Sequence, residues 1–372
     1  MKIKLQKAVL TLAACAAMTG AVEAKELIYG SWMGANATTN VISLPVYFDR
    51  IKEATNGEIE WNLIPGGQLT SGPGTVEAVG GNLIDGGTTM APYTPRELPA
   101  TNFIFNTTLA GDDVVAAAGA MNEVLLLNCP QCKQEYKRNH AVGFAGYNIT
   151  PYLLMCRRPI ASVADLEGVK VRASGGGIST MTIAGATPVA MNPAEATAAL
   201  ERGVVECVHG SLAWLKNYGY MDIVTDVLDF PLGMAGPPLL MYLNRDAWND
   251  MSPEARKAHI DNAAELVAIG TIKAQIEVDD DIRADAMSRG INFVTGGADF
   301  EAVMAERVAS QREGNIAQAT DAGVENAEEL LQAYETALAK WQTLATEIGT
   351  DVDKFTEALN REVYSKLDPE DM

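Results

Sequence analysis

One arginine and the three glycines that follow it are the residues best suited to hold an acid. Arg172 stands where the β-branched run Val169–Val171 ends, and Gly175 to Gly177 lead into a helix start. A guanidinium can donate two parallel hydrogen bonds to a carboxylate, and the free N–H groups of a helix start favour negative charge. The segment supplies no nucleophile and base beside them. Its residue types therefore predict binding of an acid, not its conversion.

The segment around this arginine, residues 163–206, predicts alternating strands and helices. Val169–Val171 and Val204–Val205 are β-branched runs that predict strands. Asn192-Pro193-Ala194-Glu195 marks a helix start, with Asn as the cap, Pro at the first helical position and Glu three residues after the cap. The predicted order is β–turn–α–β–α–β, and it places Arg172 at the end of the first strand.

Three motifs in this segment form a specific pattern. Asp165–Arg172 has the form D-L-x-G-x-K-x-R, Gly185–Met191 the form G-A-x-P-x-x-M, and Glu195–Glu206 the form E-x-x-x-A-L-x-x-G-x-V-D/E. With these motifs the chain resembles the solute-binding subunits of tripartite ATP-independent periplasmic (TRAP) transporters, the dicarboxylate-binding family. The resemblance implies an α/β periplasmic binding protein fold of two lobes, with parallel-rich sheets and long bridging C-terminal helices. It also implies that Arg172 pairs with a substrate carboxylate and that a membrane permease receives the solute.

Matching the family pattern adds candidates for contact with the ligand. They are Trp32 in the first βα loop, Met90 at the end of the third strand, Tyr152 on the hinge-side strand, His209 and Gly210 after the strand of Glu206, and the nearby aromatic residue Trp214. The second arginine of sialic-acid-type members is replaced here by Tyr152 or Pro151, and an acidic first-lobe position by Met90. These departures favour a ligand with one carboxylate and a modest apolar body. The alternative for the aromatic residues is core packing, and for Arg172 it is an ion pair with a neighbouring glutamate.

The sequence offers little for catalysis. Cys207 and His209 share a strand face, but no third residue follows that would orient them. Gly175-Gly176-Gly177 is not the dinucleotide-binding pattern, and the 3 histidines of the chain show no metal-ligand spacing. We therefore expect no catalytic residue, no metal and no cofactor. The competing functions are a periplasmic sensor that uses the same clamp and, with less support, an enzyme acting on small acids.

Four cysteines remain once the N-terminal segment is removed, and an even number in an oxidising compartment predicts disulfides. Cys129-Pro-Gln-Cys132 has the spacing of a redox motif but lacks a thioredoxin-like context, because it follows an apolar helix in what we expect to be a surface connection. We predict a local structural disulfide there. The connectivity of Cys156 and Cys207 stays open at this point.

The first 24 residues have the pattern of a signal peptide. Three lysines precede an apolar run at 8–18, and Val22-Glu23-Ala24 ends in the small-residue pattern that signal peptidase prefers. The apolar run is too short to span a bilayer. Cys15 also fits a lipoprotein processing site, but the tract after it stays small and uncharged, which favours the soluble exported form. The predicted location is the periplasm.

The chain is strongly acidic, with a formal net charge of −20 that becomes −22 when residues 1–24 are removed. Nucleic-acid binding needs clustered Lys and Arg, so this charge argues against nucleic acid as a partner, and anionic membranes are repelled as well. The simplest interpretation is solubility. An acidic protein that binds an anion must concentrate positive charge at the binding site, so an arginine in a pocket is a stronger indication of anion binding here than in a basic protein.

The 348 residues that follow the signal peptide exceed one comfortable core and predict two lobes. We assign 25–146 to lobe I, 147–236 to lobe II, and 237–372 to a strand that returns to lobe I and to long helices that bridge the lobes. A homodimer through these helices is possible. The predicted strands are 27–32, 59–64, 83–90, 141–147, 152–156 and 237–243, and the predicted helices outside the signature segment are 41–55, 74–80, 112–127, 252–288, 299–321 and 327–348.

Overall fold

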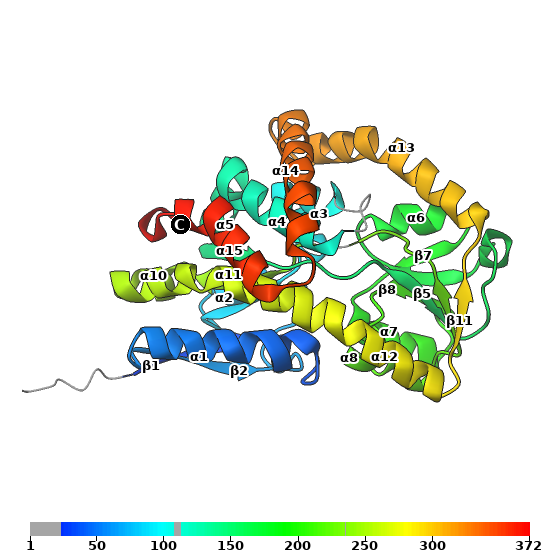
Figure 1. Ribbon diagram of the computed structural model, residues 1–372, viewed down its shortest axis with the longest axis horizontal. Coiled ribbons are helices and arrows are strands. Elements are labelled where there is room, and N and C mark those ends of the chain that lie inside the picture. The colour runs from blue at the N-terminus through cyan, green and yellow to red at the C-terminus, as the bar shows by residue number, and fades with distance from the viewer. Residues whose placement is uncertain (1–23, 108–112, 235) are drawn as a thin grey trace, which may run out of the picture.

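The computed structural model describes residues 24–107, 113–234 and 236–372. The chain forms two lobes, each built on a β-sheet with helices packed around it (Figure 1). This confirms the predicted α/β class and the long C-terminal helices. The signal peptide predicted at 1–24, including Cys15, lies outside the described residues except for its last position.

The first sheet has the order β2-β1-β3-β10-β4. Its strands are β1 (Lys25–Gly30), β2 (Ile59–Ile64), β3 (Gly86–Thr89), β4 (Ala141–Gly146) and β10 (Leu239–Asn244). β1 pairs in parallel with β2 and β3, so the strands and helices predicted between residues 27 and 90 form a βαβαβ unit. Its connections are π-helical η1 (Thr39–Ser43), α1 (Leu44–Ala54) and α2 (Thr75–Gly80). β10 is buried along its length and pairs antiparallel with β3 and β4, which brings a late part of the chain into this sheet.

The second sheet has the order β11-β9-β5-β8-β6-β7. Its strands are β5 (Leu153–Cys156), β6 (Lys170–Ala173), β7 (Thr187–Ala190), β8 (Cys207–Gly210), β9 (Asp226–Asp229) and β11 (Asn292–Thr295). Between β6 and β8 lie α6 (Gly177–Ile183) and α7 (Pro193–Glu201), in the predicted alternation. Asn192 caps α7 by accepting a hydrogen bond from Glu195 N.

The strand predicted at Val204–Val205 is wrong in its position. Gly203 adopts φ +68° and ends α7, and Val204 N then donates to Ala199 O at 2.8 Å. Val204 is 47% exposed, so its β-branched side chain belongs to the turn. β8 begins at Cys207, because the chain reaches the sheet only after this helix-terminating turn.

The single helix predicted over 252–288 is divided in the structure. It consists of α10 (Pro253–Asp261), α11 (Ala263–Ala268), the π-helical stretch η7 (Ile269–Ile276) and α12 (Glu277–Ser288). Gly270 lies in η7, where an added Cβ would stand 3.3 Å from Tyr147 Cβ and from a Leu240 methyl carbon. The irregular stretch is therefore the place where this helical segment lies closest to Tyr147, at the crossing between the lobes. The apolar periodicity of the sequence does not reveal the interruption.

The remaining long helices connect the two lobes. α13 (Ala298–Asp321) contacts α6 of the second lobe and α3 (Pro99–Thr107) of the first, and α14 (Ala327–Ile348) packs on α4 (Val114–Glu123) (Figure 1). Gly119 permits this packing, because a Cβ there would lie 2.2 Å from the Trp341 ring. The other helices are η4 (Val124–Asn128), α5 (Pro130–Arg138), α8 (Trp214–Asn217), α9 (Arg245–Asn249) and α15 (Val352–Glu362), with 3-10 turns η2 (Ala91–Tyr93), η5 (Val163–Leu166), η6 (Tyr220–Asp222), η8 (Tyr364–Lys366) and η9 (Pro369–Asp371).

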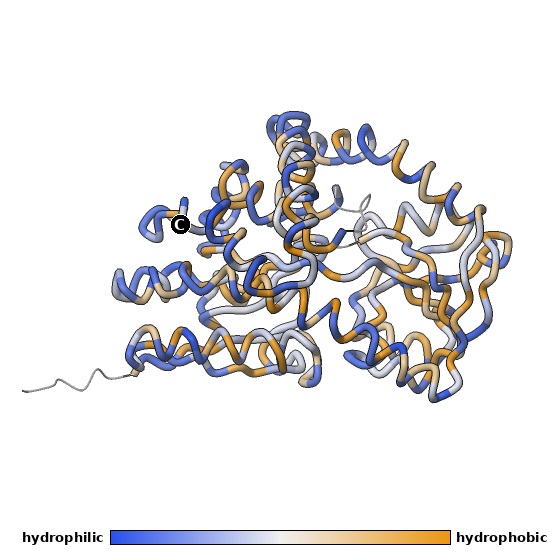
Figure 2. The backbone as a smooth tube through the Cα atoms, viewed as in Figure 1, coloured by the Kyte–Doolittle hydropathy of each residue, from blue (hydrophilic) through white to orange (hydrophobic). Residues whose placement is uncertain are grey.

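Two crossing segments run side by side between the sheets. Tyr152 N donates to Gly233 O at 2.7 Å, and Tyr147 N donates to Pro238 O at 3.2 Å. Apolar residues concentrate on the strands of the second sheet, whereas the end of the molecule at α10 is largely hydrophilic (Figure 2). Within the described residues, no helix is long and apolar enough to cross a bilayer.

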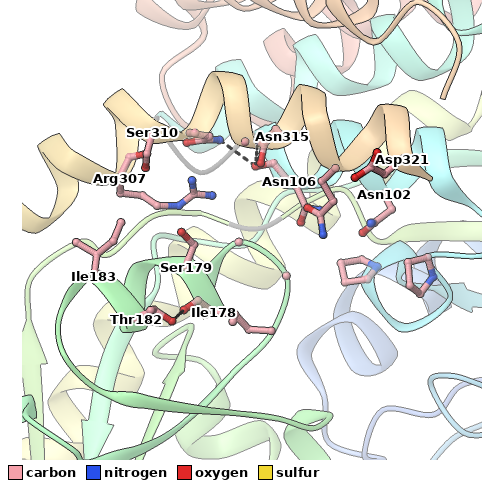
Figure 3. Close-up of a pocket in the computed structure, with 17 residues that line it drawn as sticks. Asn102, Asn106, Ile178, Ser179, Thr182, Ile183, Arg307, Ser310, Asn315 and Asp321 are labelled. Carbon is pink, nitrogen blue, oxygen red and sulfur yellow. Dashed lines mark hydrogen bonds between the residues drawn. The ribbon is translucent and has the colours of Figure 1, made fainter. Parts of the chain in front are cut away.

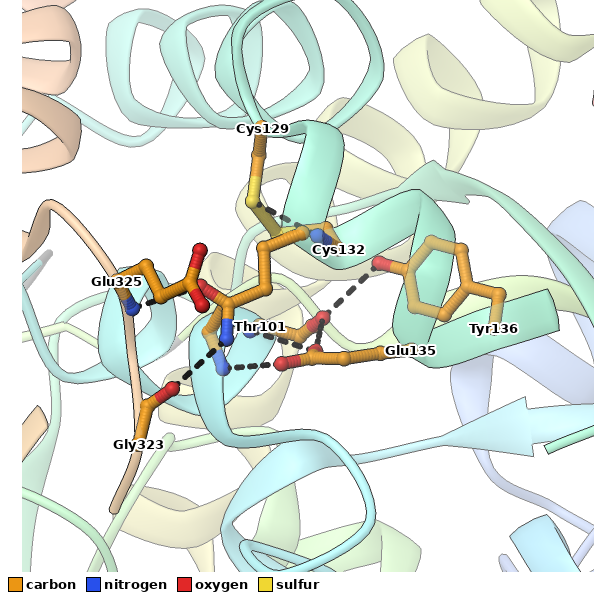
Figure 4. The surroundings of a disulfide bond; sticks show 9 residues. Thr101, Cys129, Cys132, Glu135, Tyr136, Gly323 and Glu325 are labelled. Atoms are coloured by element: carbon orange, nitrogen blue, oxygen red, sulfur yellow. Dashed lines mark hydrogen bonds between the residues drawn. A yellow bond between two sulfur atoms is a disulfide. The ribbon is translucent and has the colours of Figure 1, made fainter. Parts of the chain in front are cut away.

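Both cysteine pairs form disulfides. Cys129 bonds to Cys132 at the start of α5, beside Glu135, whose carboxylate accepts hydrogen bonds from the backbone of Ala100 and Thr101 (Figure 4). The local disulfide is as predicted, but the expected surface connection is wrong, because both cysteines are buried. Cys156 bonds to Cys207, and the two residues are direct antiparallel partners on β5 and β8.

Candidate functional site

Arg172 is fully buried in β6 and is held by neutral acceptors. Its Nε donates to Met191 O at 2.8 Å and its Nη1 to His209 O at 3.2 Å. Its Nη2 lies 3.2 Å from Ser174 Oγ and 3.5 Å from the Tyr93 hydroxyl. Two carbonyl groups and two hydroxyl groups thus fix the plane of the guanidinium but add no negative charge.

The charge of Arg172 is therefore not compensated by the protein. Among the described residues no carboxylate forms a salt bridge with it, so the alternative of a structural ion pair with a glutamate is not observed. Besides its hydrogen bonds, the guanidinium makes a cation–π contact with the Trp214 ring, whose centroid lies 5.0 Å from the guanidinium carbon. A buried positive charge with only neutral partners favours the binding of an anion beside it.

Aromatic side chains from both lobes surround the arginine. Trp32 and Tyr93 of the first lobe have ring centroids 5.6 Å apart, and in the second lobe Trp214 lies 5.2 Å from Tyr152 and 5.7 Å from Tyr218. Between them is a cavity of about 20 Å³, with Trp32, Met33, Met90, Tyr147, Trp214 and Tyr218 in its lining. This volume holds about one water molecule. The lobes are therefore closed on each other here.

The predicted site residues take different places around this cavity. Trp32, Met90 and Trp214 line it, and Trp32 Nε1 is fixed by donating to Thr88 O at 3.0 Å. Tyr152 lies behind Trp214, with a buried hydroxyl that has no hydrogen-bond partner, and burial raises its pKa, so that the hydroxyl stays protonated. Gly210 accommodates the Trp214 ring, because an added Cβ would stand 2.1 Å from it.

His209 is fully buried and is not among the residues that line this cavity. Its Nε2 lies 3.1 Å from Leu232 O, which requires the proton on Nε2, and its Nδ1 has no hydrogen-bond partner. The ring instead packs on Gly177, where an added Cβ would be 2.5 Å from Nδ1. Burial lowers the pKa of His209 to about 4, so the ring is neutral at pH 7. Its contribution to the site is the backbone carbonyl that orients Arg172.

Sequence comparison identifies the family to which this architecture belongs. The sequence profile of the bacterial extracellular solute-binding proteins, family 7, matches residues 33–318. The chain belongs to this family. As a family 7 solute-binding protein, it is a member of a group of binding proteins and not of an enzyme family.

Several known proteins are similar to this solute-binding protein in sequence or in structure. The 2,3-diketo-L-gulonate-binding periplasmic protein YiaO of Escherichia coli (strain K12) is 22% identical over 284 residues, which are 71% of this chain and 80% of that protein. A TRAP solute-binding protein of Rhodoferax ferrireducens T118, solved with copurified benzoate, has a TM-score of 0.77 at 17% identity, over 86% of this chain and 99% of that one. A marine metagenome TRAP solute-binding protein specific for aromatic acids, solved with metahydroxyphenylacetate, has a TM-score of 0.75 at 22% identity, with the same coverage.

Some residues of the site in this solute-binding protein were not found from the sequence. Tyr93 reaches Arg172 from the turn η2, three residues after Met90, and Ser174 does so from the turn that follows β6. Ser174 directly follows the end of β6, and Tyr93 lies in the turn that follows β3, so their place after strand ends is the sequence signal that could have indicated them. Met191 contributes a backbone carbonyl, for which its side chain gives no indication.

Within the described residues no positively charged side chain lines the cavity between the aromatic residues, and Arg172 itself is not part of its lining. Arg158 is exposed and pairs with Glu206 at 3.4 Å, and Lys216 is exposed on α8. Neither lines the cavity. The described residues also contain no group of three His, Cys, Asp or Glu side chains that could hold a metal ion.

Proposed function

We propose that this protein captures a small organic acid outside the cytoplasmic membrane and delivers it to the permease of a TRAP transporter. The observation that carries the proposal is the environment of Arg172. The guanidinium is buried and oriented, all four of its acceptors are neutral, and it lies at the junction of the two lobes. A carboxylate that entered this site would supply the missing negative charge.

The ligand class that fits best is a monocarboxylate with an apolar or aromatic body. The cavity walls are aromatic or apolar at Trp32, Met90 and Trp214, and rings can stack on such walls with a gain of about 0.5–1.5 kcal/mol beyond burial. A second carboxylate would lose its hydration without a counter-charge, because no cation of the described residues lines this cavity and Arg172, outside the lining, is the one charge that the proposal assigns to the ligand. The relatives solved with benzoate and with metahydroxyphenylacetate support an aromatic monocarboxylate. Small 2-oxo and 2-hydroxy acids also belong to the proposed ligand class, because they carry a single carboxylate.

Entry of such an acid requires the lobes to separate. A cavity of about 20 Å³ is too small for an organic acid, and its lining residues come from both lobes. Hinge bending at the paired crossing segments near Tyr152 and Gly233 is the motion that we propose, with closure around the ligand.

Export by the N-terminal segment and a periplasmic location belong to the same proposal. They are supported by the signal-peptide pattern of residues 1–24 and by the extracellular character of the family. Uptake of the bound acid by membranes that carry the permease should then depend on this protein. The homodimer considered from the sequence has no support from the fold or the comparisons.

Calorimetry with a matched ligand set tests the proposed ligand class. At pH 7, benzoate, mandelate and 3-hydroxybenzoate should bind more tightly than succinate, malate and fumarate. Benzamide, which keeps the ring but lacks the charge, should bind at least about 30-fold more weakly than benzoate, because a buried charged pair is lost. A C4-dicarboxylate that bound most tightly, or benzamide equal to benzoate, would contradict the proposal.

A further inference from the structure

A second, larger cavity lies under α13, and its lining includes Gly175 and Gly176 of the turn after β6 but not Arg172. Its volume is about 830 Å³, and its walls come from α13, from α3 of the first lobe and from the α6 region of the second (Figure 3). The polar lining includes Asn102, Asn106, Ser179, Thr182, Arg307 and Gln311. None of the residues that line it also lines the cavity beside Arg172.

Arg307 is the charged group of this cavity. It is 3% exposed, and within the described residues its guanidinium has neither a carboxylate nor a hydrogen-bond acceptor, with Nε buried and unpartnered. Figure 3 shows the guanidinium extending from α13 into the space above Ser179. Arg312, on the same helix, is exposed and paired with Glu328 at 2.5 Å and Glu335 at 3.5 Å. The missing partner is therefore a property of Arg307 and not of arginines on α13 in general.

Two lining residues of this cavity, Asn106 and Gln311, carry buried amide oxygens that have no hydrogen-bond partner among the described residues. Gln311 Nε2 donates to Asn106 O at 2.9 Å and to Thr107 O at 3.0 Å, so the amide orientation is fixed and Oε1 is left buried without a donor. Asn106 Oδ1 is also buried and unpartnered, and it lies 3.1 Å from the Cβ position of Gly175. The lining residues thus carry one cationic donor and two unpartnered neutral acceptors, which are the complement of a carboxylate next to hydroxyl or ammonium groups. Small side-chain movements would have to bring the two buried oxygens to the cavity surface.

We propose that this cavity is a second binding site, for a small carboxylic acid that also carries hydroxyl or ammonium donors. The carboxylate pairs with Arg307, and the donors bond to Gln311 Oε1 and Asn106 Oδ1. Asp321, the acidic residue of the lining, lies about 21 Å further along α13 at 1.5 Å per residue, so it does not neutralise Arg307. The lining is rich in amides, unlike the aromatic site at Arg172, so the two sites select different acids.

Binding to the full protein with the first site removed tests this proposal. In an Arg172→Ala background, titration calorimetry with D-glycerate and L-serine should show saturable binding. The additional change Arg307→Gln should weaken it about ten-fold or more, since a charged hydrogen-bonded pair is lost. Arg312→Gln in the same background is the matched control and should leave the affinity unchanged. Acetate, which lacks the donors, and glycerol, which lacks the carboxylate, should each bind more weakly than D-glycerate.

Two results would overturn the proposal. One is the absence of saturable binding of both acids to folded Arg172→Ala protein, and the other is equal binding with and without Arg307→Gln. If the Arg307→Gln protein does not fold, the nuclear magnetic resonance signal of Arg307 Nε–H in the Arg172→Ala protein decides instead. It should shift as D-glycerate is added while that of Arg312 stays constant, and an unchanged Arg307 signal rejects the site. A negative result for the second site does not affect the benzoate titration of the unaltered protein, which tests the proposed function separately.

Discussion

Arg172 and Arg307 are both buried arginines without a carboxylate partner among the described residues, yet their surroundings differ. Arg172 is held by four neutral acceptors and covered by the Trp214 ring, whereas Arg307 has no acceptor and faces amide groups. A guanidinium that is already oriented loses little freedom when a ligand arrives, so it can bind more tightly. From this comparison we expect the neighbours of a buried charge, more than the charge itself, to determine which acid is selected and how strongly.

The largest expected effect is the loss of acid binding when Arg172 is removed. Arg172→Ala should weaken benzoate binding by about 30-fold or more, because losing one partner of a buried charged pair costs about 2–5 kcal/mol. Arg172→Lys should restore only part of the affinity, since an ammonium cannot reproduce the two-donor fork. Titration calorimetry measures both.

The same measurement on Arg307→Ala separates the two arginines. Its affinity for benzoate should stay within about two-fold of that of the unaltered protein, as expected for independent sites. Equal losses of benzoate affinity in Arg172→Ala and Arg307→Ala would show that the two arginines serve one site and would contradict the assignment of two separate sites.

The second effect is a loss of stability at acidic pH that originates beside Arg172. Burial lowers the pKa of His209 from its ordinary value of 6.5 to about 4, so between these values the unfolded chain binds more protons than the folded one. The free energy of unfolding therefore falls as the pH drops from about 6.5 to about 4, by up to about 3 kcal/mol for this residue. Urea unfolding at pH 7 and at pH 4.5 measures the difference, which should be smaller in His209→Gln.

His259 provides the matched control for this experiment. It is also fully buried, and burial lowers its pKa to about 4 as well, but it lies in the first lobe between Trp61 Nε1 and Ala255 O. His259→Gln should reduce the pH dependence of stability in the same direction without any change in benzoate binding at pH 7. If neither variant alters the pH dependence, neutral burial of the histidines is not its cause.

The smallest effect concerns two glycines, one beside each arginine site. Gly177→Ala should destabilise the protein by about 1–3 kcal/mol, since the new methyl group would stand 2.5 Å from His209 Nδ1. Gly314→Ala, on α13 in the lining of the second cavity, has no atom within 4 Å of the added carbon and should instead stabilise by about 0.4–1 kcal/mol. Thermal or urea unfolding distinguishes the signs, and a neutral Gly177→Ala would show that His209 moves freely.

Local patterns predicted those parts of the molecule that short-range physics determines. The strand Ile59–Ile64 and the helix Ala327–Ile348 have the predicted bounds, because alternation and helical periodicity are complete within each segment. The segment 252–288 was predicted as one helix because its periodicity continues past Asn262, whereas in the structure the helix is interrupted there and again in η7. The break in η7 accompanies the close approach of Gly270 to Tyr147, a contact that the sequence of the segment does not encode locally.

The candidate site shows the same division. The position of Arg172 followed from its motif, but its contact with Tyr93 depends on the approach of a turn from the other lobe. Arg307 has the pattern of a charged residue on a solvated helix face, and only the packing of α3 and α6 against α13 buries it. The sequence therefore does not predict burial or contacts that arise between segments distant in the chain.

The Cys156–Cys207 disulfide links the binding function to the redox conditions around the protein. The bond joins residues 51 positions apart, and the loop that it closes contains Arg172, Met191 and the Gly175–Gly177 turn. Closing a loop of this length reduces the entropy of the unfolded chain by an amount equivalent to about 4 kcal/mol. A chain that stays where thiols remain reduced lacks this contribution in the lobe that carries Arg172. With export as proposed, oxidation would complete this lobe only after the chain has left the cytoplasm.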